Sequence, residues 1–522
     1  MNEHQQIIGF DWSALGKNIF FSYNPVSGIY NDHSFYNATV EEVDLAAKKS
    51  ARAFQQYRKK SGVEKAAFLE AIADEILKAG DHLVEICCNE TGLPKGRIEG
   101  ERGRTIGQLK LFAELLKDGS WVDARIDTAM PDRKPAPKPD IRFMNIAIGP
   151  VVVFGASNFP LAFSVAGGDT VSALAAGCPV IVKAHAAHPA TSAIIGNAIQ
   201  IAAKNMNMPD GVFSLLFDDG IQIGIELVKH PLIKAVGFTG SFKAGKALND
   251  VALSRPEPIP VYAEMSSTNP VFILPKMMKE HGAAIAAGYS ASLTLGVGQF
   301  CTNPGLLFYR KTDDVFKALL KNEFEKTNGG TMLTSNILKS YETGLNDLVA
   351  TAGVDQLATG KNSDENNYAT PALMTTDVST FNQHVHLAEE IFGPVSLAVR
   401  VNSRQEMLDI ANKLSGHLTA TVYGGEDELI EYKNLLEILE QKVGRVIINN
   451  FPTGVEVCSA MVHGGPYPAT TNDRTTSVGT AAIFRFTRPV CFQNMPQALL
   501  PPELQDENPL SISRLFNGKR AI

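Results

Sequence analysis

The chain has 522 residues, more than one compact core can organise, which predicts two or three domains of ordinary size. Hydrophobic residues make up 44% and charged residues 20% of it, as in globular proteins, and a net charge of −7 gives no basic field for a nucleic acid. The sequence shows neither a secretory signal nor a run of about 18 uninterrupted apolar residues that would span a membrane. We therefore expect a cytoplasmic protein without nucleic-acid or membrane partners.

The N-terminal third of the chain is predicted to be helical after an extended lead-in. Apolar residues recur at helical spacing over residues 64–77, and another helix is expected over residues 100–116. At two places a hydroxyl residue is followed three positions later by glutamate, which is the capping-box pattern of a helix start. The two pairs are Thr39 with Glu42 and Ser61 with Glu64. Four prolines within residues 131–139 indicate an extended connection.

Short apolar strands alternate with helices in the rest of the chain. The first block has strands predicted over residues 151–154, 179–182, 213–217 and 235–238, with helices that include residues 171–176 and 192–203. The second block has strands predicted over residues 306–309, 395–401, 419–423 and 446–449. Such alternation is typical of parallel, doubly wound α/β sheets. Residues 481–490 are predicted to form one more strand.

A nucleotide-binding fingerprint of the GxGxxG kind is missing from the predicted strand ends. Gly296 and Gly298 are followed by Gln299, so the third glycine of that motif is absent. Glycine-bearing turns follow two predicted strands instead, at residues 155–160 and 237–241. Either turn could bring backbone N–H groups and a helix N-terminus to a phosphate, although such turns are more often structural. The turns alone leave nucleotide binding open.

Two side chains are candidates for covalent chemistry. Among six cysteines, Cys301 is flanked by glycines and turn formers, which leaves its sulfur accessible as a nucleophile requires. On these surroundings alone a structural cysteine is still favoured, by roughly two to one. Glu264 ends a predicted strand, where a carboxylate is either solvated or a general base. The spacing of the cysteines and histidines predicts no metal site.

Six motifs, in order and at compatible spacing, resemble those of the aldehyde dehydrogenase superfamily over nearly the whole chain. They are Asn158-Phe159-Pro160, Lys183 at a strand end, Phe238-Thr239-Gly240-Ser241, the glutamate motif at Glu264, Gly298 to Cys301, and Glu390 to Pro394. The resemblance implies that the Cys301 thiolate attacks an aldehyde and forms a thioester. It also implies that the Asn158 amide and the Cys301 backbone N–H hold the oxyanion, and that Glu264 activates the hydrolytic water.

The same resemblance assigns a nicotinamide dinucleotide to the chain. Lys183 and Glu390 are expected at the two riboses, Gly240 and Ser241 along the pyrophosphate, and Phe392 near the nicotinamide riboside. Members that prefer NAD usually carry a glutamate three positions after the lysine, where this chain has Ala186. Without that carboxylate nothing repels a 2′-phosphate, so we expect both cofactors to be used and NADP to be favoured. His185 or His188 could assist NADP binding, although a histidine on an exposed loop is more often idle.

The glutamate motif and the C-terminal run 461–470 resemble a narrower branch, which contains 2-oxoglutarate semialdehyde (2,5-dioxopentanoate) dehydrogenases and a fatty-aldehyde dehydrogenase. By alignment with the family, Arg104 faces the substrate entrance, with Gln108 one helical turn further and Phe159 in the substrate region. A guanidinium there suits the carboxylate of the semialdehyde, whereas a surface salt bridge to Glu99 or Glu101 is the alternative. The rival functions are oxidation of long-chain aldehydes and, from another class, a cysteine-dependent thioesterase or esterase without nucleotide.

The fold implied by the resemblance has two doubly wound parallel-sheet domains and a small bridging, oligomerising β-sheet. Residues 1–130 and 148–265 are expected to form the dinucleotide-binding domain, and residues 266–447 the catalytic domain with its nucleophilic cysteine. Residues 131–147 and 480–495 are expected to supply the bridging strands. Because such strands pair across subunits in the family, a homodimer or homotetramer is expected.

Overall fold

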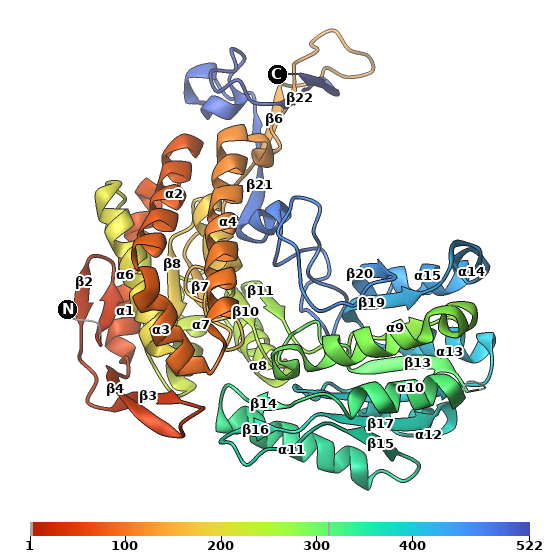
Figure 1. Ribbon diagram of the computed structural model, residues 1–522. Helices are drawn as coiled ribbons and strands as arrows, with labels where there is room; N and C mark the ends of the chain where they lie inside the picture. Colours follow the sequence, from red (N-terminus) through yellow and green to blue (C-terminus); the bar gives the residue numbers. More distant parts are fainter. Residues whose placement is uncertain (1–3, 312–313, 522) are drawn as a thin grey trace.

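A computed structural model describes residues 4–311 and 314–521 of the chain. Two α/β domains lie side by side, and an arm of thin strands that includes the C-terminal end projects from the first of them (Figure 1). The predicted fold class is confirmed, because both domains are built on sheets of mostly parallel strands covered by helices.

The first domain is organised by a seven-stranded sheet in the order β11-β10-β7-β8-β9-β1-β2. Its strands are β1 (Gln6–Ile8), β2 (Asp11–Ser13), β7 (Val151–Phe154), β8 (Val180–Lys183), β9 (Phe213–Leu216), β10 (Ala235–Thr239) and β11 (Val261–Glu264). The last five are parallel to one another, and their carboxyl ends meet at one edge of the sheet. The extended lead-in supplies β1 and β2, which add to the sheet as antiparallel strands.

Among the described residues, eight α-helices and one hairpin belong to the first domain. The helices are α1 (Val40–Tyr57), α2 (Gly62–Lys78), α3 (Gly80–Thr91), α4 (Lys95–Asp118), α5 (Gly168–Ala176), α6 (Pro189–Asn205), α7 (Gln222–Lys229) and α8 (Phe242–Leu253), and the hairpin is β3 (Ile19–Asn24) with β4 (Ile29–Tyr36). Both predicted capping boxes are confirmed at the starts of α1 and α2, where hydroxyl and carboxylate satisfy free backbone N–H groups reciprocally.

The second domain repeats this construction with the strand order β15-β17-β18-β13-β12-β19-β20. The strands are β12 (Val271–Ile273), β13 (Leu306–Arg310), β15 (Asp355–Thr359), β17 (Ala372–Asp377), β18 (Val395–Val401), β19 (His417–Tyr423) and β20 (Val443–Ile448). The helices are α9 (Pro275–Thr294), α10 (Asp314–Phe324), α11 (Ser335–Ala350), α12 (Val378–Gln383), α13 (Arg404–Lys413), α14 (Glu426–Glu431) and α15 (Lys433–Glu440), with a short ladder of β14 (Gly330–Thr331) and β16 (Tyr368–Ala369). Only β15 is antiparallel in the seven-stranded sheet.

The projecting arm differs in extent from the expected bridging segments. Its sheet has the order β21-β6-β5-β22-β23, with β5 (Arg125–Asp127), β6 (Ile141–Ala147), β21 (Thr487–Gln493), β22 (Arg514–Phe516) and β23 (Lys519–Ala521). Three of these strands therefore lie outside residues 131–147 and 480–495. The strand predicted over residues 481–490 is wrong in its first half, because Thr480–Phe486 is a 3-10 helix. Ile483 and Phe486 recur at the three-residue spacing of that helix, and both are fully buried.

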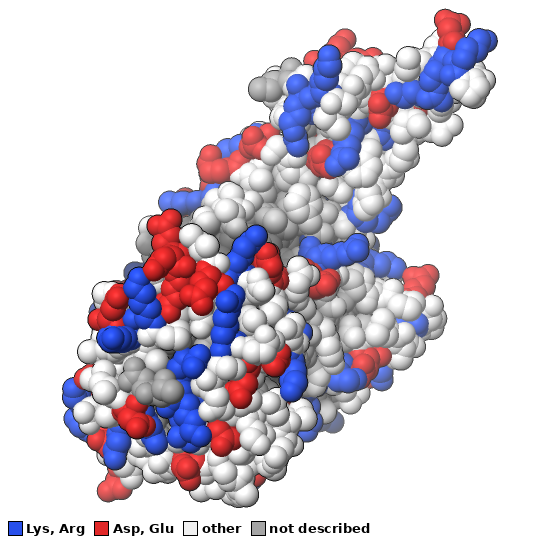
Figure 2. Space-filling view, turned by 90° about the vertical axis from the view of Figure 1, so that its right-hand side faces the viewer, with Lys and Arg blue, Asp and Glu red and all other residues white. Residues whose placement is uncertain are grey.

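Charged side chains of both signs alternate over the face in Figure 2, and no continuous field of one sign covers it. Within residues 4–311 and 314–521, the helices are all too short or too polar to cross a membrane.

A buried ion pair fixes the 3-10 helix at Thr480–Phe486 to the first domain. Arg485 Nη1 lies 2.7 Å from Asp169 Oδ1 of α5, and both side chains are almost completely shielded from water. Burial raises the pKa of Asp169, and the charge of Arg485 opposes that rise. The pair holds the start of the C-terminal arm against the sheet.

Replacing Asp169 with Asn should lower the free energy of unfolding by about 3 kcal/mol, because it leaves the Arg485 charge buried and unpaired. Calorimetry should show the loss as a lower transition temperature. The double variant Asp169→Asn/Arg485→Met should recover part of it, since the orphan charge is then removed as well. Additive losses in the double variant would show that the two side chains do not stabilise each other.

Candidate active site

A cavity of about 1010 Å³ lies between the two large domains, at the carboxyl ends of β7, β8, β10 and β11. It includes every residue predicted for catalysis or cofactor binding. They are Asn158, Lys183, Ala186, Gly240, Ser241, Glu264, Cys301, Glu390 and Phe392. Ligand pockets usually measure about 300–1000 Å³, so this cavity is large enough for an extended ligand.

One end of the cavity has the features of a nucleotide site. Lys183 ends β8 and donates a hydrogen bond to the Asp218 carbonyl. Ser241 caps α8, where its Oγ accepts from the Ala244 N–H, so the positive end of that helix faces the cavity. Burial raises the pKa of Glu390 to about 7, against hydrogen bonds from Ser266 and Ser267. These groups can bind hydroxyls and phosphates.

The two histidines near Ala186 are not exposed. His188 is fully buried, and its ring nitrogens lie 2.9 Å from the Ala156 carbonyl and 3.2 Å from Ser192 Oγ. Burial, with the charges of His188 and Lys183, lowers the pKa of His185 to about 3. His185 is therefore neutral at physiological pH and supplies no positive charge to the cavity.

The loop that carries Cys301 is held in an unusual backbone conformation. Gly296, Val297 and Gly298 are all left-handed, with φ of 54°, 60° and 65°. A side chain on Gly298 would place its Cβ 2.4 Å from the Gly393 carbonyl, so only glycine fits there. Val297 is β-branched and strained at this angle. The chain thereby turns sharply just before the nucleophile and presents Cys301 to the cavity.

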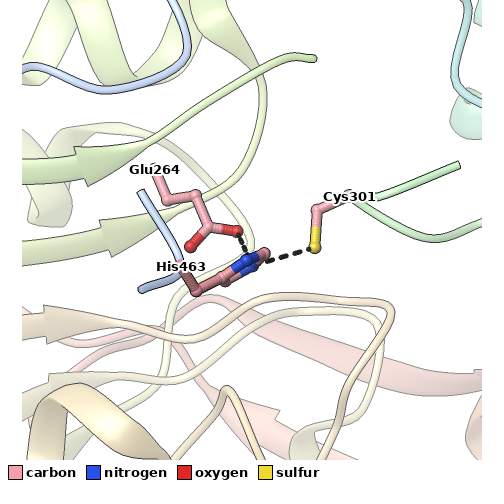
Figure 3. A group of neighbouring side chains, drawn as sticks. All are labelled: Glu264, Cys301 and His463. Carbon is pink, nitrogen blue, oxygen red and sulfur yellow. Dashed lines mark hydrogen bonds and ion pairs between the residues drawn. The ribbon is translucent and has the colours of Figure 1, made fainter. Parts of the chain in front are cut away.

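Three side chains from distant parts of the sequence meet at this point (Figure 3). His463 Nε2 lies 3.4 Å from Cys301 Sγ and 2.9 Å from Glu264 Oε1. The second carboxylate oxygen of Glu264 accepts a 2.6 Å hydrogen bond from Ser477 Oγ. Glu264 and His463 are each only 1% exposed. One imidazole nitrogen thus faces both groups. Its N–H donates to the carboxylate, and the carboxylate is the group that can accept a proton from the sulfur.

Charge and burial shift the pKa of Glu264 and the pKa of the Cys301 thiol in opposite directions. Burial alone would raise the pKa of Glu264, but the charge and contact of His463, with the Ser477 hydrogen bond, hold it below its usual value. Glu264 is therefore ionised at neutral pH and can accept a proton. Burial, followed by the Glu264 charge, raises the pKa of the Cys301 thiol well above its usual range, while Arg104 opposes the rise. The resting thiol is protonated, so its activation has to remove a proton.

Asn158 lies beside the nucleophile loop. Its Nδ2 donates a 3.0 Å hydrogen bond to the carbonyl of Gln299, two residues before Cys301. The backbone carbonyl of Asn158 accepts a hydrogen bond from Arg97 Nη2. Another amide, Asn269 Nδ2, donates to the Cys301 carbonyl at 2.9 Å. The assignment of Asn158 to the oxyanion stays a prediction.

The three residues predicted for the substrate lie outside the lining of the large cavity. Phe159 packs edge-on against Phe300 and Phe163. The Arg104 guanidinium lies over two of these rings, at 5.9 Å from Phe159 and 5.4 Å from Phe163. Gln108 is buried, and a Cβ on Gly168 would come within 2.7 Å of its Nε2.

The alternative surface salt bridge of Arg104 is not found among the described residues. Glu101 instead accepts from the Leu161 and Ala162 N–H groups and lies 3.5 Å from Arg97. Within the described part of the chain, Arg104 Nε and Nη2 are shielded from water and have no hydrogen-bond partner. Two such donors are costly to leave unpaired, which points to a ligand that accepts from them.

Sequence reasoning missed three functional positions. His463 was noted only as part of the C-terminal run 461–470, and Ser477 and Arg445 were not singled out. Arg445 donates to the Pro452 and Gly454 carbonyls and so holds the loop beside the site. The run His463-Gly464-Gly465-Pro466, a histidine before residues that permit close backbone approach, was the available signal. Among the described residues, Glu264, Cys301 and His463 also form the one three-residue group of zinc-ligand type, with donor atoms within 4.8 Å.

Alkylation of Cys301 should report on these interactions directly. Glu264→Gln removes the negative charge that raises the thiol pKa, so iodoacetamide should modify Cys301 faster at pH 8. His463→Asn removes the ring N–H that faces the sulfur and would stabilise its thiolate, so it should slow the reaction. Mass spectrometry of the Cys301 peptide measures both rates, with exposed Cys491 as an internal control that should not change. A slower reaction in Glu264→Gln would contradict this electrostatic assignment.

Comparison with known proteins identifies the family. The model of the aldehyde dehydrogenase family matches residues 14–487. An alpha-ketoglutaric semialdehyde dehydrogenase 2 of Azospirillum brasilense is 48% identical over 518 residues, covering 99% of both chains. An alpha-ketoglutaric semialdehyde dehydrogenase of Acinetobacter baylyi is also 48% identical, covering 99% of this chain and 98% of its own.

Solved structures agree with the fold. A betaine aldehyde dehydrogenase mutant of Staphylococcus aureus with bound NAD+ superposes with a TM-score of 0.80 at 19% identity, covering 95% of this chain and 97% of its own. An aldehyde dehydrogenase C mutant of Pseudomonas syringae, in complex with NAD+ and octanal, gives 0.81 at 18% identity and covers 96% and 98%. The chain therefore belongs to the aldehyde dehydrogenase family and is an NAD(P)-dependent enzyme.

Proposed function

We propose that the enzyme oxidises 2-oxoglutarate semialdehyde to 2-oxoglutarate. The observation that carries this proposal is the pair of shielded, unpartnered N–H donors of Arg104, close enough to Cys301 for its charge to act on the thiol. The substrate has a carboxylate remote from its aldehyde, and a guanidinium binds a carboxylate through two parallel hydrogen bonds. The names of the two relatives at 48% identity support the same substrate.

We assign the chemical steps to residues as follows. Cys301 Sγ attacks the aldehyde carbon as the thiol proton passes to the Glu264 carboxylate, whose oxygen lies with Sγ and His463 Nε2 in one group of donor atoms within 4.8 Å of one another. The oxygen of the resulting thiohemiacetal is stabilised by the Asn158 amide and the Cys301 N–H. A nicotinamide dinucleotide held by Lys183, Ser241 and Glu390 would supply the hydride acceptor that converts the thiohemiacetal on Cys301 into a thioester. Once the thiol proton has been released to solvent, Glu264, ionised and held by Ser477, takes a proton from the water that hydrolyses the thioester.

The proposed function can be tested by reduced-cofactor formation at 340 nm with matched concentrations of 2-oxoglutarate semialdehyde and decanal. We expect a strong preference for the semialdehyde, with one reduced cofactor formed per acid. A preference for decanal would favour the long-chain alternative and keep the mechanism. Ester or thioester hydrolysis without nucleotide, and no oxidation of either aldehyde, would favour the thiol hydrolase.

The role of Arg104 predicts a selective loss. Arg104→Ala should lower kcat/KM for the semialdehyde by about 100-fold, mainly through KM, because a charge-assisted bidentate contact is removed. Oxidation of pentanal, which has no carboxylate, should change little. Arg102 on the same helix donates to the Gly80 carbonyl instead, so Arg102→Ala is a matched control. Equal losses for both aldehydes in Arg104→Ala would contradict the assignment.

We propose further that both NAD and NADP are used and that NADP is favoured. In the described cavity lining the carboxylates are Glu264 and Glu390, and the position of the usual ribose glutamate is Ala186. No second cation beside Lys183 lines the cavity in the part that the structure describes, so the preference rests on absent repulsion. A cytoplasmic location and a homodimer or homotetramer formed through the projecting sheet remain predictions from the sequence.

Introducing the missing carboxylate should reverse the cofactor preference. Ala186→Glu should raise KM for NADP at least about ten-fold through repulsion of the 2′-phosphate, and should improve NAD through a bond to the ribose hydroxyl. Ala186→Gln has the same size without the charge and is the matched control. The measurement is the ratio of kcat/KM for the two cofactors. If the ratio of kcat/KM for NADP and NAD did not change in Ala186→Glu, the 2′-position of the adenosine ribose would not lie beside residue 186.

A further inference from the structure

The hairpin of β3 and β4 extends from the first domain toward α11, β14 and β16 of the second (Figure 1). No motif of the sequence explains what this hairpin does. Tyr23 and Tyr30 are direct cross-strand partners, with ring centroids 5.4 Å apart. Both line the large cavity together with Lys183, His185 and Ile221. Tyr30 is nevertheless 67% exposed, which is unusual for an aromatic ring in a preformed pocket.

The hairpin is also fixed to the segments that follow β8 and β9 of the first domain. Ser22, next to Tyr23, donates to the buried carboxylate of Glu90, which also accepts from the backbone and hydroxyl of Thr191 at the start of α6. After β4, Asn37 exchanges hydrogen bonds with Asp219 in the loop after β9. The segments that follow β8 and β9 therefore set the position of the two tyrosines.

The tip of the hairpin is fixed to the other domain. Asn366 Nδ2 donates to the Val26 carbonyl at 3.2 Å, and Asn367 Nδ2 donates to the Pro25 carbonyl at 3.4 Å. The turn is stabilised internally, because Asn24 Oδ1 accepts from the Val26 and Ser27 N–H groups. The hairpin thus spans both walls of the cavity and is attached at each end.

We propose that this hairpin is a strap over the cofactor cavity and that Tyr23 and Tyr30 bind the adenosine half of the dinucleotide. The proposal rests on the use of a dinucleotide by this site. A pair of aromatic rings that lines a cavity, with Tyr23 half-buried and Tyr30 exposed, offers π-faces to a flat base and hydroxyls to a ribose or phosphate. The adenosine half is favoured because the strap is rooted beside the loops after β8 and β9, whereas Cys301 and Glu264 mark the nicotinamide end.

The strap also predicts a kinetic role for its tip. Release of a dinucleotide beneath it requires the contacts of Asn366 and Asn367 to open, so these amides should slow dissociation. They touch the hairpin backbone and do not line the cavity, which separates their effect from direct binding. A cross-strand aromatic pair can also serve only to stabilise a hairpin, and the experiment has to distinguish the two roles.

Isothermal titration of the full-length enzyme with NADP, NAD, 2′,5′-ADP, ADP and nicotinamide mononucleotide tests the proposal without reference to activity. Tyr23→Leu/Tyr30→Leu keeps an apolar cross-strand pair but removes the rings. It should raise the Kd of both dinucleotides about ten-fold. The Kd of the adenosine-half probe that the wild type binds should rise by the same factor, and the Kd of nicotinamide mononucleotide should stay unchanged. Tyr23→Phe/Tyr30→Phe should retain most of the affinity.

The matched control is Ile29→Ala, an exposed residue on β4 next to Tyr30 whose side chain points to the opposite face. It should bind every probe like the wild type. Asn366→Ala/Asn367→Ala should raise the dissociation rate of the dinucleotide several-fold in stopped-flow fluorescence. If Tyr23→Leu/Tyr30→Leu bound the adenosine-half probe as tightly as the wild type, the proposed role of the two tyrosines would be wrong, but the dinucleotide site would stand. A wild-type enzyme that binds neither NADP nor NAD would overturn the dinucleotide site itself.

Discussion

The active site depends on one backbone constraint, the crossing of the C-terminal run over the end of β11. Met265 N–H donates to the Ala469 carbonyl at 2.7 Å, Thr471 N–H donates to the Ala263 carbonyl at 3.1 Å, and Glu264 pairs with Thr470 in an isolated antiparallel bridge. β11 is an edge strand, so this crossing covers an edge that would otherwise remain unpaired. It also delivers His463 and Ser477 to the two oxygens of Glu264. Glu264, His463 and the Ser477 hydroxyl are thus brought together by a single strand pairing.

Much of the architecture could be predicted because local signals and tertiary context agree. The core strands from β7 to β10 are short, apolar and separated by turn formers, and both capping boxes satisfy their own helix starts regardless of the surroundings. The projecting sheet could not be delimited in this way. Residues 480–486 have a strand-like composition, but they pack on α5 and pair Arg485 with Asp169, so tertiary contacts select a 3-10 helix.

The site could be predicted only as far as its residues carry local motifs. Cys301, Glu264 and Asn158 lie in recognisable turns, and the fold brings all three to one cavity. His463 is 162 residues from Cys301 in sequence, and its contact arises from the C-terminal crossing, which has no local signature. The same holds for the burial of His185 and for the open donors of Arg104. Whether a polar side chain is solvated or shielded is decided by packing from distant segments.

The hairpin has a consequence for how the chain becomes functional during synthesis. Its tip binds Asn366, which is 340 residues further along the chain, although its base can dock as soon as the first domain has folded. Domains generally fold in order as they are synthesised, and contacts of long sequence separation form late. The first domain should therefore exist for a time with its ligand cavity open on one side. Closure of that cavity is a late step in folding, coupled to completion of the catalytic domain.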